Sequence, residues 1–109
     1  MIKTANMSTK DMINARTASV QLKAAPERFT VTGLAISQDV DKETGEMREV
    51  GYIAADNDTV YGTISNTALQ TIEEIINAVE NEEISLPCEI GVGLRKSNAG
   101  REFITLTLF

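Results

Sequence analysis

Few side chains in this 109-residue chain could carry out acid–base or metal chemistry. The chain contains no histidine and a single cysteine, Cys88, which argues against imidazole-based triads, thiol nucleophiles and ordinary zinc sites. Asp39, Asp41 and Glu43 alternate as in a calcium loop, but the glycine comes one position late and Val50 replaces the closing glutamate. We therefore expect no enzyme, no metal site, no cofactor and no small-molecule substrate.

The aromatic and basic side chains form a more informative group. On the last predicted strand, Phe103 has the parity of Arg101, opposite the apolar positions, so its ring should face outward or lie at a barrel mouth. Rings beside cations are typical of surfaces that bind unpaired nucleic acid, because each stacked base contributes roughly 1–3 kcal/mol without sequence preference. The candidate nucleic-acid-binding residues are Arg48, Tyr52, Tyr61, Arg95, Lys96, Arg101 and Phe103.

Each candidate also has a purely structural explanation. Aromatic side chains on strands are commonly packing residues, and cations beside a hairpin turn keep edge strands from pairing with other chains. Only the coincidence of these residues on one side of the molecule favours binding over packing.

One helix divides the strands that must position these residues. Apolar side chains recur at helical spacing from Leu69 to Val79, which predicts an amphipathic helix over Asn66–Val79 with one buried stripe. Alternating patterns predict strands on both sides of this helix. They cover Arg28–Val40, Met47–Ala55 and Thr59–Ile64 before it, and residues 88–95 and 103–109 after it.

The first of these strands changes its buried face at a glycine. Phe29 and Val31 share one parity, Leu34 and Ile36 share the other, and Gly33 lies at the change. This pattern predicts a β-bulge that lets one strand bend and serve two sheets. The fold class is then mainly β. The order of three strands, a helix and two strands is that of the five-stranded OB-fold barrel with one capping helix, and a split sheet of another topology is the alternative.

The beginning of the chain has a weaker pattern. We divide the chain into an N-terminal arm, residues 1–17, and a single OB-fold domain, residues 18–109. Within the arm, Ser8 and Asp11 could cap a short helix. Residues 19–24 alternate and predict a short edge or accessory strand.

Charge is distributed unevenly along the chain, which has a net charge of −6. Residues 1–28 and 90–109 carry an excess of cations, whereas the middle of the chain holds most of the acidic residues. This segregation leaves room for a basic binding face, and it allows self-association in which the basic arm touches the acidic middle of the next molecule. No apolar run approaches the roughly 18 residues of a membrane span, so we expect a soluble, cytoplasmic protein.

Several short stretches resemble the small single-stranded DNA-binding proteins of bacteriophages, which coat exposed strands during replication. These stretches are Asn-Ala-Arg-Thr-Ala-Ser at 14–19, Glu-Thr-Gly-Glu at 43–46, Tyr-Gly-Thr-Ile-Ser at 61–65, and Arg-Lys-Ser at 95–97 followed by Gly100, Arg101 and Phe103. The resemblance implies a barrel of this kind, no catalysis, no cofactor and sequence-tolerant binding to single-stranded DNA in the host cell cytoplasm. It also implies that Tyr61, Arg101 and Phe103 are contacts.

A second hypothesis comes from the acidic residues. The segments 39–49 and 73–89 could form an acidic surface that imitates nucleic acid or docks on a basic partner. A DNA-binding protein should lose its partners from a lysate after nuclease treatment, whereas a mimic should keep them.

Overall fold

A long, bent strand, β3 (Arg28–Val40), joins the two halves of the sheet in the computed structural model, which describes residues 3–109. Its first residues pair with β6 (Cys88–Lys96), and most of the strand pairs with β4 (Met47–Ala55). The register with β4 shifts between Val31 and Gly33, which confirms the predicted bulge. A Cβ atom at position 33 would lie 2.7 Å from the carbonyl oxygen of Asn6, so this close approach requires a glycine.

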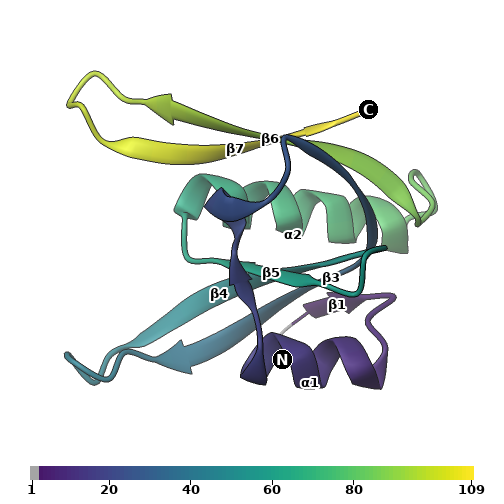
Figure 1. Ribbon diagram of the computed structural model, residues 1–109, viewed down its shortest axis with the longest axis horizontal. Coiled ribbons are helices and arrows are strands. Elements are labelled where there is room, and N and C mark those ends of the chain that lie inside the picture. The colour runs from purple at the N-terminus through teal and green to yellow at the C-terminus, as the bar shows by residue number, and fades with distance from the viewer. Residues whose placement is uncertain (1–2) are drawn as a thin grey trace.

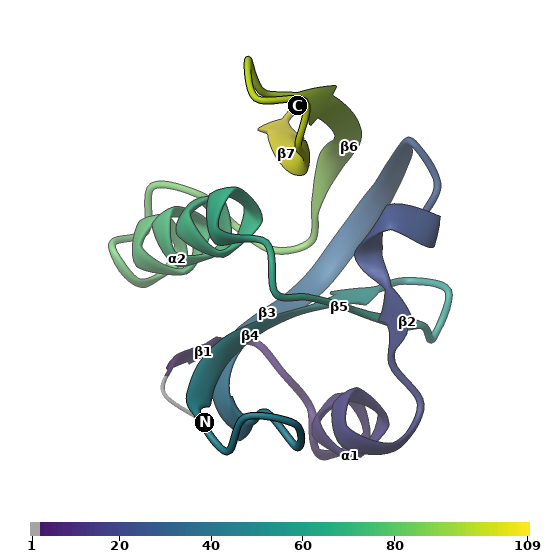
Figure 2. The same cartoon turned by 90° about the vertical axis from the view of Figure 1, so that its left-hand side faces the viewer.

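The sheet follows the strand order β2-β5-β4-β3-β6-β7, and β1 pairs with β3 outside this order. The five predicted strands are all present, with β5 spanning Val60–Thr63 and β7 spanning Glu102–Leu108. The accessory strand predicted at residues 19–24 is present only as β2 (Val20–Gln21), and a further short strand, β1 (Lys3–Ala5), was not predicted. The result is a seven-stranded sheet that curls into a half-barrel, as Figure 2 shows, so the predicted closed five-stranded barrel is not confirmed.

The sheet stays open because β2 pairs with the edge of β5, where the predicted barrel would close. In the predicted barrel, β5 would pair with β7, but β5 pairs instead with β2, in parallel. The chain then forms a short 3-10 helix, η1 (Leu22–Ala24), with Leu22 buried in the core. It continues to Glu27, whose carbonyl oxygen accepts a hydrogen bond from the Val92 amide on β6 at 2.8 Å. The segment between β2 and β3 therefore crosses from the edge of β5 to β6.

The helix α2 (Asn66–Glu80) fills the concave side of the sheet. It begins at the predicted residue and runs one residue further than predicted. Its apolar stripe is buried as expected, since Ile72 and Ile76 are fully enclosed and pack in one core cluster with Leu34, Ile53 and Ile90 of the sheet. Burial of this stripe is the main force that holds the curled sheet to the helix.

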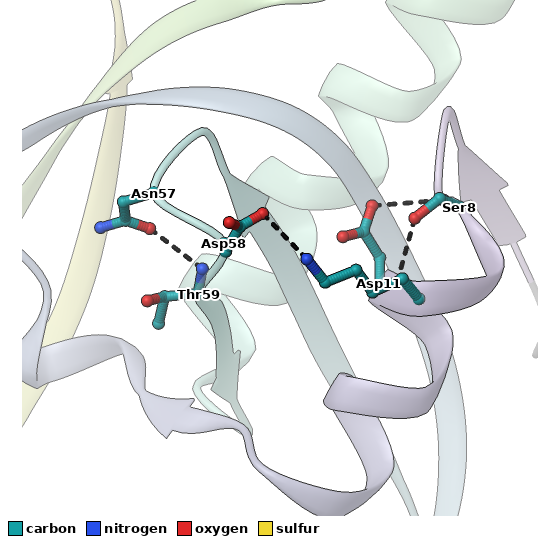
Figure 3. Close-up of polar contacts among 6 residues, drawn as sticks. Ser8, Asp11, Asn57, Asp58 and Thr59 are labelled. Atoms are coloured by element: carbon teal, nitrogen blue, oxygen red, sulfur yellow. Dashed lines mark hydrogen bonds and ion pairs between the residues drawn. The ribbon is translucent and has the colours of Figure 1, made fainter.

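A second helix, α1 (Thr9–Thr17), covers part of the outer face of the sheet (Figure 1). Ser8 and Asp11 form the predicted cap, in which the Asp11 amide donates to the Ser8 hydroxyl at 3.1 Å and the Ser8 amide donates to the Asp11 carboxylate at 3.2 Å. Lys10 pairs with Asp58 of the β4–β5 turn at 3.3 Å (Figure 3). Within the predicted arm, residues 3–17 thus form β1 and α1 and lie against the sheet, while residues 1–2 lie outside the described part of the chain.

Candidate nucleic-acid interface

Two hairpins, β3–β4 and β6–β7, project toward the side of the molecule where α2 begins (Figure 1). A cleft of about 650 Å³ lies between the ends of β4 and β5, the segment around β2, and the β6–β7 hairpin. Three of the predicted binding residues line it, namely Arg48 and Tyr52 from β4 and Phe103 from β7. This volume is within the roughly 300–1,000 Å³ that is common for ligand sites in proteins.

Tyr52 and Phe103 offer aromatic surface to this cleft. Both side chains are half-buried, so part of each ring is held by the protein and part is accessible. Tyr52 is paired with Gly62 across β4 and β5, and its ring lies close to the Gly62 backbone. A Cβ atom at position 62 would come within 3.3 Å of the ring. Tyr52 also packs against the small cluster under α1 that includes Ala15 and Val60. These contacts fix the ring, which is what a stacking surface requires.

Tyr61 lies elsewhere, and the expectation that its ring is a surface platform is wrong. Its side chain is only 5 % exposed, and its ring centroid lies 5.0 Å from that of Phe29 in the main core. Strand parity could not reveal this, because β5 is covered on both faces. The main core covers Tyr61 on one face, while Val60 on the other packs against Ala15 of α1.

Of the four predicted cations, only Arg48 lines the cleft, and the other three lie on the hairpin beside it. Arg48 lines it and lies 3.7 Å from the Asp41 carboxylate at an exposed ion pair. Arg95, Lys96 and Arg101 are exposed on the β6–β7 hairpin, and Arg95 is paired in register with Phe103. Within residues 3–109, none of the three hairpin cations has an acidic partner within 4.0 Å. They are therefore available to an anionic ligand.

The electrostatic balance of the cleft is mixed. Asp39 and Glu102 line it together with Arg48 and Lys23, so the walls carry both signs of charge. Burial raises the pKa of the Tyr52 hydroxyl above its usual 10.0, Asp39 raises it further, and Arg48 partly offsets both effects. Tyr52 is therefore neutral at physiological pH, and its hydroxyl can donate a hydrogen bond.

The candidate residues did not include Leu94, Ile64 and Lys23, which also line the cleft. Leu94 has the parity of buried Ile90, but it is 55 % exposed because the β6–β7 hairpin extends beyond the helix that covers its base. Ile64 follows β5 and is 57 % exposed in the same cleft, and Lys23 belongs to η1. In the sequence, only their location at the ends of predicted strands could have indicated that these three side chains are exposed.

Side chains suited to catalysis are not gathered in this structure. Within residues 3–109, no three histidine, cysteine, aspartate or glutamate side chains are arranged to hold a metal ion. Cys88 is half-buried, and burial raises the pKa of its thiol, so little thiolate is present at neutral pH. No helix in the same range is long and apolar enough to cross a membrane.

Comparison with known proteins gives one match. The family model described as phage single-stranded DNA-binding protein matches residues 2–109, which is almost the whole chain. The chain belongs to this family of phage single-stranded DNA-binding proteins. The family is non-enzymatic and binds DNA, in agreement with a cleft that combines rings and cations. No curated protein and no solved structure matches the chain.

Proposed function

We propose that this phage single-stranded DNA-binding protein coats exposed strands during phage DNA replication, in the host cell cytoplasm and without sequence preference. The bases stack on Tyr52 and Phe103, while Arg48, Arg95, Lys96 and Arg101 contact phosphates. The observation that carries this proposal is the convergence of two half-exposed rings, from β4 and β7, on one cleft. The β6–β7 hairpin beside it carries three cations that have no acidic partner within 4.0 Å among residues 3–109.

Stacking explains why the binding should tolerate any sequence. Every base has a flat face that a ring can cover, and each such contact contributes roughly 1–3 kcal/mol. With Tyr61 in the core, the cleft offers two rings in place of the three that the sequence predicted. We therefore expect moderate affinity for each protein molecule.

The proposed site also has the place of the ligand groove in the OB fold. In that fold, the ligand lies across the second and third strands, flanked by the loops after the first and fourth strands. Here the corresponding strands are β4 and β5, and the corresponding loops are the tips of the β3–β4 and β6–β7 hairpins. We propose that the chain is an open variant of the OB fold, in which the segment around β2 takes the place of one strand pairing.

Intrinsic tyrosine fluorescence provides a direct test, because the chain has only two tyrosines and no tryptophan. Oligothymidine should quench the fluorescence of Tyr52, which lines the cleft, and leave that of buried Tyr61 largely unchanged. Tyr61→Phe should therefore keep the quenching. Tyr52→Phe should abolish it while retaining affinity, measured by the anisotropy of a labelled oligothymidine.

The opposite pattern would contradict the proposed site. If Tyr52→Phe kept the quenching and Tyr61→Phe removed it, the bases would stack near Tyr61 and the cleft would not be the binding surface. If the wild type bound no oligothymidine at low salt, the proposed function would be wrong.

A further inference from the structure

We infer that the segment Ser19–Lys23, here called the N-terminal wall, is part of the DNA-binding surface, and that a bound strand is held between this wall and the β6–β7 hairpin. The inference rests on the proposed function and adds a surface to it. All five residues of the N-terminal wall line the cleft that contains Tyr52 and Phe103.

The N-terminal wall is fixed to the rest of the protein through its three central residues. Val20 and Gln21 pair in parallel with Tyr61 and Gly62 of β5. Leu22 is 1 % exposed and belongs to the main core. Because Leu22 anchors the wall from within, the residues on either side of it are held at the rim of the cleft.

Exposed apolar side chains gather in the cleft. Within residues 3–109, eight large apolar side chains are exposed by 41 % or more. Three of them line this cleft, and they come from three different parts of the chain: Val20 of the N-terminal wall, Ile64 after β5, and Leu94 of β6. Leaving such side chains in water costs free energy, which a partner that covers them would recover. An apolar surface beside two aromatic rings suits the faces of nucleobases.

The N-terminal wall also contributes a cation. Lys23 is exposed, lines the cleft, and has no acidic partner within 4.0 Å in the described part of the chain. Arg48 lines the same cleft from β4, so cations reach it from two separate elements. An unpaired strand offers both the phosphates for these cations and the bases for the apolar residues, which identifies the ligand of the wall as the same DNA.

Binding of one strand to both surfaces has a mechanical consequence. No hydrogen bonds between β5 and β7 close the sheet within residues 3–109, and the N-terminal wall occupies the edge of β5. A DNA strand that contacts both the N-terminal wall and the β6–β7 hairpin would bind only while the N-terminal wall is paired with β5. Bound DNA should therefore stabilise the docked wall.

Two matched pairs of variants test the wall and the hairpin separately. Lys23→Ala should weaken oligothymidine binding and lower the slope of log affinity against log salt by about 0.7, the value for one phosphate contact on a single strand. Lys10→Ala, which removes an exposed lysine of α1 outside the cleft, should leave the slope unchanged. Leu94→Ser should weaken binding by about fivefold, whereas Leu108→Ser, at an exposed leucine of the same hairpin outside the cleft, should not.

Hydrogen exchange on the wild-type protein provides a measurement that needs no variant. The backbone amides of the N-terminal wall should exchange more slowly when oligothymidine is bound than when it is absent. Unchanged exchange there, or Lys23→Ala and Leu94→Ser variants that bind like their controls, would overturn the inference. If Phe103→Ala still weakened binding in those experiments, the proposed function would stand without the wall. A wild type that bound no oligothymidine would overturn both.

Discussion

Phe103 is the residue whose predicted role can be tested most simply. Its ring is half-buried on β7, lines the cleft, and lies in register with Arg95. Phe103→Ala should weaken oligothymidine binding by about 5-fold to 150-fold, because one stacked base contributes roughly 1–3 kcal/mol. Phe103→Tyr keeps an aromatic ring and should retain most of the affinity. Equal binding by the alanine variant and the wild type in an anisotropy titration would remove Phe103 from the site.

The Tyr52 hydroxyl links this site to pH. Burial raises its pKa, with a further contribution from Asp39, so the folded protein favours the neutral phenol. The resulting stabilisation is fully present below the usual pKa of 10.0 and is lost as pH rises through the raised value. The free energy of unfolding, measured in urea at neutral and alkaline pH, should fall more in the wild type than in Tyr52→Phe. An identical fall in both proteins would show that Tyr52 ionisation does not affect folding.

Individual residues show where the sequence was sufficient and where it was not. Parity alone placed Phe103 on the outer side of its strand, and the structure puts it in the cleft. The same reasoning failed for Tyr61, because alternation distinguishes two faces only when one of them is solvated. The sequence carries no local signal that α1 covers the second face of β5.

At the scale of elements, the β6–β7 hairpin carries three cations that have no acidic partner within 4.0 Å in the described residues 3–109. Replacing Arg95, Lys96 and Arg101 together by alanine should reduce the slope of log affinity against log salt by about 2, since each phosphate contact on a single strand contributes about 0.7. Arg16→Ala, at an exposed arginine of α1 outside the cleft, is the control and should leave the slope unchanged. If the triple variant kept the wild-type slope, the hairpin would not contact phosphates.

The bulge in β3 gives a prediction about stability. A Cβ atom at position 33 would lie 2.7 Å from a backbone oxygen, that of Asn6, so Gly33→Ala must displace the chain between β1 and α1. We expect a loss of about 1–3 kcal/mol in the free energy of unfolding, measured in urea. Gly93→Ala is a matched control in the same sheet, since its nearest atom is the Thr105 hydroxyl at 3.0 Å, which can rotate away. A larger loss at position 93 than at 33 would contradict this explanation.

The elements with a long pattern were predicted closely. β3 and β4 have the predicted bounds, and α2 differs by one residue, because each is long and carries many apolar positions. The strand β1 has three residues, which is too short for any periodicity to appear, and only Val20 and Gln21 of the strand predicted at residues 19–24 form β2. The pairing of β2 with β5 leaves no edge for β7, so the closure of the barrel could not be predicted from strand order.

At the scale of the whole molecule, the segregated charges are partly paired within one chain. Lys3 pairs with Glu73 at 3.0 Å, Lys10 pairs with Asp58, and Arg28 pairs with Glu89. These are the basic N-terminal and acidic middle segments that we expected to meet between neighbouring molecules. Self-association along DNA stays a prediction, and its electrostatic basis is weaker than the sequence indicated.

A titration of long poly(dT) tests this self-association. Contacts between neighbouring molecules should make the affinity per binding site higher on poly(dT) than on an oligothymidine that holds one protein molecule. Added salt should reduce this difference in affinity. Equal affinities on the two substrates at low salt would show that the molecules bind independently. The proposed cleft does not depend on the outcome, because its residues belong to one chain.

The net charge of −6 means that local contacts, and not long-range attraction, must bring DNA to this protein. The most direct test of the cleft is an anisotropy titration of labelled oligothymidine with the wild type, the Tyr52→Ala/Phe103→Ala double variant and Tyr61→Phe as a control. We predict salt-dependent binding by the wild type and the control, and a loss of at least about 25-fold in the double variant if each ring contributes 1 kcal/mol or more. A double variant that is folded and binds like the wild type would contradict the account.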